Sequence, residues 1–204
     1  LGNRILQTGW LNNYLKYTSD QESPTVFHMW TGLTIMSAAL RRRVWLDWNF
    51  YKIYPNLYVA LIAISAESKK TTAANIGVNL LRQIGMFREL KGKVCIIQPK
   101  TTPEGLIMRM QRADWDDETG RALPDGSVFV YAPELKVFLS ESGARDLIPL
   151  LTDLYGCPDD WTYTTRARET EEVSNAYPVF LACSNPKWYA QCISEDAQAG
   201  GFTG

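Results

Sequence analysis

The chain is poor in the side chains that most often bind transition metals. It contains one histidine, His28, and four cysteines, none of which forms a Cys-x-x-Cys pair. This composition argues against a structural zinc site, because such sites take four cysteine or histidine ligands at short spacings. Free thiols in a reducing cytoplasm are the simplest interpretation of the set Cys95, Cys157, Cys183 and Cys192.

Long apolar runs and an excess of either charge are also missing. No run reaches the roughly 20 residues of a membrane span, and no secretory signal is present. The net charge of −1 offers no general attraction to nucleic acid. Only Arg41-Arg42-Arg43 forms a dense basic group, and a solvated helix end is its favoured interpretation. We expect a cytoplasmic protein without membrane contact.

The remaining composition is that of an ordinary globular domain. Its 204 residues are 46% apolar and 21% charged, which suffices for one sizeable core. The chain begins at Leu1 and ends in a glycine-rich stretch at Gly204, so we expect it to be a segment of a longer polypeptide.

Continuous apolar runs alternate with segments of helical periodicity along the chain. Strands buried on both faces of a sheet have such runs, so the pattern predicts an α/β fold with a mainly parallel sheet in three layers. Residues 1–53 are expected to form a helical lead-in with two short strands, and residues 54–204 the core. The expected core strands are at 57–64, 93–98, 127–132 and 179–183, with a polar loop at 114–125.

The segment Leu57–Ala73 has the layout of a phosphate-binding loop. An apolar strand leads into a small polar turn, and lysines and threonines then open a helix. In such loops, backbone N–H groups and the helix N-terminus point at one anion, and a lysine adds its charge. The candidate nucleotide-binding residues are Ser65, Ala66, Glu67, Ser68, Lys69, Lys70, Thr71 and Thr72.

The loop lacks glycine, and two registers are open. In the preferred register Lys69 binds the phosphate, Ala63 and Ser68 hold the glycine positions, and Thr71 or Thr72 reaches magnesium. In the other register Lys70 is the phosphate lysine and Thr71 follows it, but Ile64 and Lys69 replace the glycines. A plain buried strand followed by an amphipathic helix is the simpler interpretation of the same residues.

Two polar residues that follow later strands could complete a hydrolytic site. Glu134 comes after the strand at 127–132, and Asn185 comes after the strand at 179–183. The carboxyl ends of parallel strands meet at one edge of the sheet, where ligands bind. There Glu134 would polarise water or hold magnesium through water with Thr71, and Asn185 would position the attacking water. Alternatively, Glu134 stabilises a helix first turn and Asn185 is a turn former or helix cap.

Several motifs resemble the P-loop ATPase domain of phage and mobile-element replication proteins, which are helicases or primase-helicases. They are Tyr54-Pro55-Asn56-Leu57-Tyr58-Val59, the Lys-Lys-Thr turn, Ala132-Pro133-Glu134-Leu135, the stretch from Leu151 to Tyr163, and Gly200-Gly201-Phe202. The resemblance covers the chain from about Trp10 onward. It implies a P-loop core of AAA+ or RecA type, with Lys69 as loop lysine, Glu134 as catalytic acid and Asn185 as sensor.

The resemblance also implies ATP and Mg²⁺ as cofactors, a ring-forming homo-oligomer, single-stranded DNA as partner and, for a phage protein, the host cytoplasm. Two hypotheses follow. The chain is either the ATP-hydrolysing motor domain of a replication helicase, or a degenerate P-loop domain that acts as a nucleotide-binding or assembly module. A DNA-packaging or transposition ATPase is a third, weaker interpretation, since fold analogy does not separate such motors.

Overall fold

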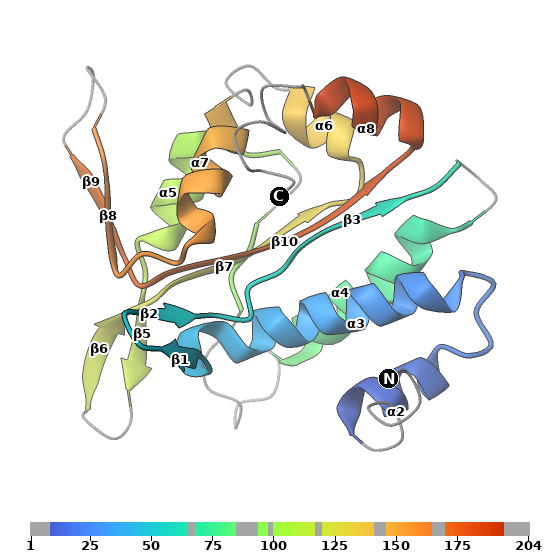
Figure 1. Ribbon diagram of the computed structural model, residues 1–204, viewed down its shortest axis with the longest axis horizontal. Coiled ribbons are helices and arrows are strands. Elements are labelled where there is room, and N and C mark those ends of the chain that lie inside the picture. The colour runs from blue at the N-terminus through green and yellow to red at the C-terminus, as the bar shows by residue number, and fades with distance from the viewer. Residues whose placement is uncertain are drawn as a thin grey trace.

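The centre of the fold is a parallel sheet of four strands. A computed structural model describes residues 9–64, 68–84, 94–97, 100–116, 120–140, 146–164 and 170–193. Within these residues the sheet has the strand order β3-β10-β7-β4 (Figure 1). Its strands are β3 (Tyr58–Ile62), β10 (Ala176–Ser184), β7 (Gly126–Ala132) and β4 (Ile96–Ile97).

The two central strands show why the apolar runs form a sheet. Every residue of β7 and β10 is buried, as expected for strands that are covered on both faces. Phe180 is aligned with Tyr58 of β3 and with Val130 of β7, and all three pairings of neighbouring strands are parallel. The prediction of an α/β fold with a parallel sheet is confirmed.

Helices cover both faces of the sheet, which is compatible with three layers. Along β7, Phe129 and Tyr131 belong to one apolar core, whereas Val128 and Val130 belong to the core on the opposite face. This alternation follows from the two-residue period of a strand. The first face is covered by α2 (Trp10–Tyr17), α3 (Thr25–Leu40) and α4 (Lys70–Ile84). The second face is covered by α5 (Pro103–Met110), α6 (Leu135–Ser140) and α7 (Leu147–Tyr155). A further helix, α8 (Pro186–Cys192), lies beside α6.

Within the described ranges, three antiparallel hairpins lie outside the main sheet. The first, β1 (Leu46–Trp48) with β2 (Tyr51–Ile53), was expected from the sequence. The second, β5 (Ala113–Asp116) with β6 (Arg121–Pro124), shows that the predicted polar loop at 114–125 is wrong. The third, β8 (Asp160–Tyr163) with β9 (Glu171–Ser174), was not anticipated. The last two are short and largely polar, so they lack the apolar pattern that identifies a buried strand.

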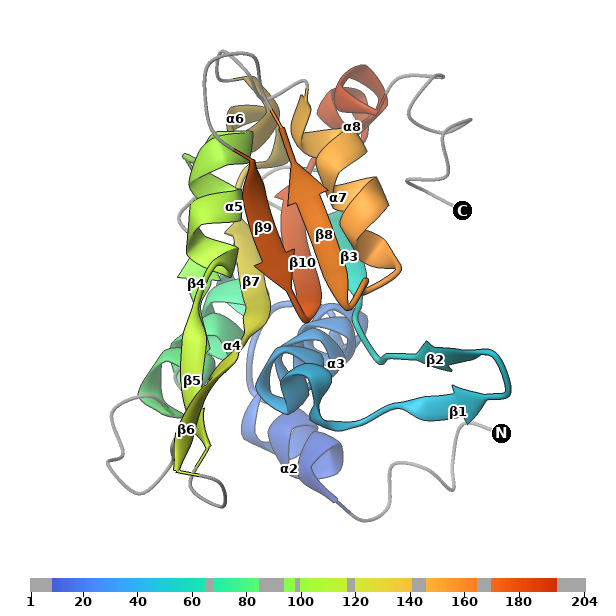
Figure 2. The same cartoon turned by 90° about the vertical axis from the view of Figure 1, so that its left-hand side faces the viewer.

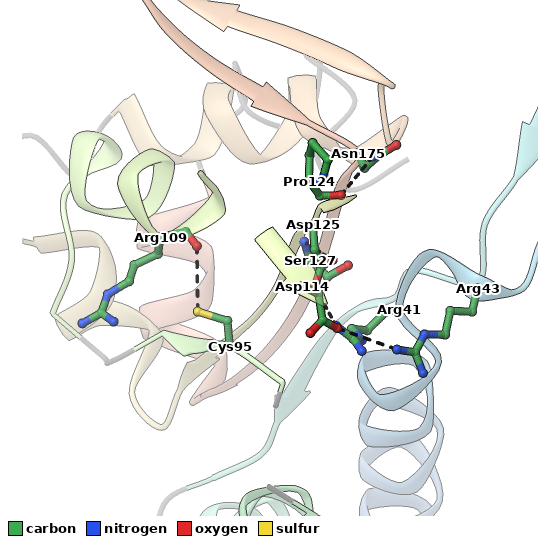
Figure 3. A network of polar contacts seen from close by, with 9 residues as sticks. All are labelled: Arg41, Arg43, Cys95, Arg109, Asp114, Pro124, Asp125, Ser127 and Asn175. Carbon is green, nitrogen blue, oxygen red and sulfur yellow. Dashed lines mark hydrogen bonds and ion pairs between the residues drawn. The ribbon is translucent and has the colours of Figure 1, made fainter. Parts of the chain in front are cut away.

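The arginine cluster also differs from expectation, because two of its members form structural ion pairs. The cluster forms the short 3₁₀ turn η1 (Arg41–Arg43) after α3. Buried Arg41 donates to Asp114 and Asp125 at 2.6 Å each, at the base of the β5–β6 hairpin (Figure 3). Burial alone would lower the pKa of Arg41, but the two carboxylates outweigh it and raise that pKa.

The other two arginines are bound as well. Arg42 donates to Asn175 Oδ1 at 3.1 Å and pairs with Asp159. Arg43, whose side chain is mostly exposed, lies 3.8 Å from Asp114 (Figure 3). The interpretation as a solvated helix end is therefore wrong for Arg41 and Arg42, and the cluster is not a free basic patch either.

Candidate functional site

The candidate site lies where β3 and β10 end side by side. After β3 the chain enters α4 on one face of the sheet, whereas after β10 it enters α8, which packs beside α6 on the other face (Figure 1). Two adjacent strands whose connections diverge in this way mark the point at which open α/β sheets bind ligands. Beyond the strands, Ala63 N still donates to Ser184 O at 3.2 Å.

Lys69 is directed toward the connection between α2 and α3. Its side chain pairs with Glu22, and its backbone carbonyl accepts a hydrogen bond of 3.0 Å from Ser23 Oγ. Its φ of 44° lies in the left-handed region, where glycine is normally preferred. Lys69 therefore occupies a backbone position typical of glycine, and its charge is already paired.

Lys70 differs from its neighbour in burial and in surroundings. It is the first residue of α4 and is only 8% exposed. No carboxylate of the described residues lies within ion-pair distance of its ammonium group. Since none of the described carboxylates balances the charge of this largely buried lysine, the position favours an anion as its counterpart.

Three side chains, from the start of α4 and from the turn after β7, act on the thiol of Cys183 in β10. Burial raises the pKa of this thiol to about 11, while a hydrogen bond with Thr71 and the charge of Lys70 act against that shift and Glu134 adds to it. Lys70 and Thr71 open α4, and Glu134 lies between β7 and α6. All three therefore lie in the vicinity of Cys183 at the carboxyl end of the sheet.

The other predicted site residues have different surroundings. Ser68 Oγ donates to Ile64 O at 3.4 Å, and the side chain of Thr72 is exposed. Asn185 lies beside the site at the end of β10, but its Oδ1 accepts a 2.8 Å hydrogen bond from Trp188 N and caps α8. Three loop residues and one motif lie outside the described residues: Ser65, Ala66, Glu67 and Gly200-Gly201-Phe202.

The donor set suits a phosphate better than a bare metal ion. A largely buried lysine and a threonine at the start of a helix are typical of anion sites, since the helix N-terminus carries partial positive charge. Among the described residues, no group of three or more histidine, cysteine or acidic side chains could hold a metal ion. Mg²⁺ that is bound together with a nucleotide needs few protein ligands, because phosphates and water supply the rest.

Sequence reasoning missed two contributors to this region. Cys183 lies on the same face of β10 as Val179 and Leu181, which faces α3 and α4. Strand alternation could have placed it under the helix that starts at Lys70. The contact of Glu22 and Ser23 with Lys69 spans more than 40 residues along the chain and left no local sequence signal.

Comparison with known proteins gives no relative from which a function could be transferred. No family model matches the chain, and no curated protein is detectably similar to it. Within the part of the chain that the structure describes, no helix is both long and apolar enough to cross a membrane.

Proposed function

We propose that the chain binds the phosphates of ATP at the carboxyl ends of β3 and β10 and hydrolyses the nucleotide. The observation that carries this proposal is the presence of largely buried Lys70, of Thr71 and of Glu134 in the vicinity of Cys183, where two adjacent parallel strands end and their connections diverge. A lysine for the phosphates, a hydroxyl that can reach Mg²⁺ and a residue that positions the nucleophile are recurring parts of phosphoryl-transfer sites.

The surroundings of the two lysines support the register in which Lys70 is the phosphate lysine. Thr71 then follows directly and supplies the hydroxyl for magnesium, as in the usual motif. Lys69 takes the position of the second glycine, in keeping with its positive φ, and its side chain pairs with Glu22 instead. We therefore replace the preferred assignment of Lys69 with Lys70.

Each residue has a distinct chemical role in this proposal. Lys70 neutralises phosphate charge, and Thr71 together with Glu134, through water, would hold Mg²⁺. Bound Mg²⁺ would offset charge on the phosphate oxygens. Glu134 orients and polarises the attacking water. Asn185 can take part through its amide nitrogen, because its oxygen caps α8.

The coupling of hydrolysis to single-stranded DNA, and to a ring of subunits, depends on the resemblance to replication helicases. The arginines of η1 are unsuited to that DNA contact, because they form ion pairs with Asp114, Asp125 and Asp159. Stimulation of ATP turnover by single-stranded DNA, measured on the purified chain, tests the helicase assignment separately from the nucleotide site.

The test of hydrolysis is Glu134→Gln. This change keeps the shape of the side chain and removes its charge, so ATP binding should persist while turnover falls by about 10²–10⁴-fold, the usual contribution of a general base. The control is Asp153→Asn, an exposed carboxylate on α7 that should leave turnover unchanged. Equal turnover in wild type and Glu134→Gln would remove Glu134 from the mechanism.

A second candidate function is nucleotide binding or assembly without turnover. Two contacts favour this function: Lys69 pairs with Glu22, and Asn185 Oδ1 caps α8. In a loop that is open for hydrolysis, both side chains would be available to the nucleotide. ATP binding that is lost in Lys70→Ala, together with absent turnover in the wild type, would identify this function.

A further inference from the structure

The β1–β2 hairpin presents an uncovered apolar face. Its register pairs Leu46 with Ile53 and Trp48 with Tyr51, which places these four side chains on one side of the two-stranded sheet. Leu46 and Ile53 are 56% and 44% exposed, and Trp48 and Tyr51 are 55% and 59% exposed. A two-stranded hairpin is marginally stable alone in water, so a fully apolar face is expected to pack against something.

The tip of the hairpin continues this surface. Phe50 is 99% exposed, and Figure 2 shows the hairpin extending away from α3 and α4. An aromatic side chain presents roughly 150–250 Å², so the exposed parts of Trp48, Phe50 and Tyr51 amount to on the order of 400 Å². With Leu46 and Ile53 added, the patch exceeds half of the ~800 Å² that each partner contributes to a standard protein interface.

The charges around the hairpin favour a protein partner over nucleic acid. Asp47 lies opposite Lys52 on the second face, and Lys52 Nζ lies 4.7 Å from the ring centroid of Trp45. The arginines that precede the hairpin are held by aspartates. Nucleic-acid affinity comes mainly from free cations that neutralise phosphates, and this surface offers a balanced pair instead.

The same chain carries an apolar pocket large enough to receive such a tip. It has a volume of about 480 Å³ and lies between the C-terminal halves of α3 and α4, closed on one side by Trp10. Its lining is almost entirely apolar and includes Ile35, Met36, Ala39, Leu80 and Ile84. An apolar projection and an apolar hollow at different places on one chain form a head-to-tail contact between copies.

We propose that the β1–β2 hairpin of one copy docks into the pocket between α3 and α4 of a second copy, with Phe50 as its central anchor. Exposed aromatic residues that fill a pocket on the partner commonly supply most of the binding energy of an interface. The contact is independent of ATP, because neither surface includes Lys70, Thr71 or Glu134.

Sedimentation velocity of the nucleotide-free chain over a range of concentrations tests the proposal. Wild type should self-associate, Phe50→Ser should weaken association at least tenfold, and Ala39→Gln should do the same by filling the pocket with a polar group. Ala39 is exposed on α3 and Phe50 lies in a turn, so both variants should fold, as circular dichroism would verify. Met108→Ser, at an apolar residue on α5 that is 63% exposed, is the matched control and should associate like wild type.

Mixing the two variants separates this arrangement from a symmetric hairpin-to-hairpin contact. Phe50→Ser retains an intact pocket and Ala39→Gln an intact hairpin, so an equimolar mixture should form a heterodimer although each variant alone is monomeric. A monomeric wild type, association that survives Phe50→Ser, or no recovery on mixing would overturn the proposal. Binding of a single-stranded oligonucleotide that Phe50→Ser abolishes in a monomeric chain would assign the hairpin to nucleic acid instead.

Discussion

At the scale of single residues, the buried arginine Arg41 links three parts of the chain. It ends α3 and bonds to Asp114 in β5 and to Asp125 directly after β6. When one partner of a buried ion pair is removed, the opposite charge stays buried without compensation. Such a change lowers the free energy of unfolding more than most single substitutions do.

Arg41→Ala should therefore lower the free energy of unfolding by about 3–5 kcal/mol. Arg43→Ala is the matched control, because its side chain is mostly exposed and its 3.8 Å ion pair with Asp114 is worth about 0–1 kcal/mol. Urea denaturation of both variants beside wild type measures the difference. Similar losses in the two variants would show that burial of the Arg41 pair has little energetic importance.

His28 gives the protein a pH-dependent stability near neutrality. It is buried in α3, neither ring nitrogen has a hydrogen-bond partner among the described residues, and burial lowers its pKa. The unfolded chain thus binds a proton at His28 more readily than the folded chain does, so stability should decrease as the pH falls below about 6.5.

The measurement is the free energy of unfolding between neutral and mildly acidic pH for wild type and His28→Leu. Carboxylates contribute to both proteins, and only the slope that belongs to His28 should disappear in the variant. Parallel pH profiles would mean that His28 has the same pKa in the folded and unfolded states.

At the scale of elements, the packing of α2, α3 and α4 depends on a close approach at Gly77. A Cβ at this position would collide with Thr31 Cγ2 of α3 and lie 3.2 Å from Tyr14 Oη of α2. Both neighbours are buried, so the helices would have to move apart.

Gly77→Ala should consequently destabilise the fold by about 1–3 kcal/mol, the usual cost of overpacking, despite the better helix propensity of alanine. Asn79→Ala, at an exposed position of the same helix, should change stability by no more than about 0.5 kcal/mol. Thermal unfolding followed by circular dichroism compares the two. A Gly77→Ala variant as stable as wild type would mean that the contact among the three helices relaxes freely.

The elements that were predictable from sequence are those whose burial sets a local pattern. The apolar runs of β3, β7 and β10 and the helical spacing in α2 identify their elements without knowledge of tertiary contacts. The hairpins β5–β6 and β8–β9 lack such a pattern. The ion pairs of Arg41 with Asp114 and of Arg42 with Asp159 join segments more than 70 residues apart, so a local pattern could not reveal them.

The candidate site was predictable to a similar degree. The expected parallel strands and the rule that ligands lie at strand ends predicted that Glu134 lies near the lysine turn. The choice between Lys69 and Lys70 was not decidable from the motif alone, because it depends on which side chain faces inward and on the distant contact with Glu22.

At the scale of the whole molecule, the proposed nucleotide site and the hairpin surface lie at different places. The site is at the carboxyl ends of the sheet strands, while the hairpin follows η1 and extends from the body of the protein (Figures 1 and 2). Association through the hairpin and binding at the sheet edge can therefore be altered separately by mutation.

The most direct test of the central claim is ATP binding measured by calorimetry on wild type, Lys70→Ala and Lys69→Ala. The two variants remove the same charge from adjacent positions, so each is the control for the other. Wild type and Lys69→Ala should bind ATP, whereas Lys70→Ala should lose binding by at least tenfold. Loss of binding in Lys69→Ala with retention in Lys70→Ala, or no binding by the wild type, would contradict the proposed site.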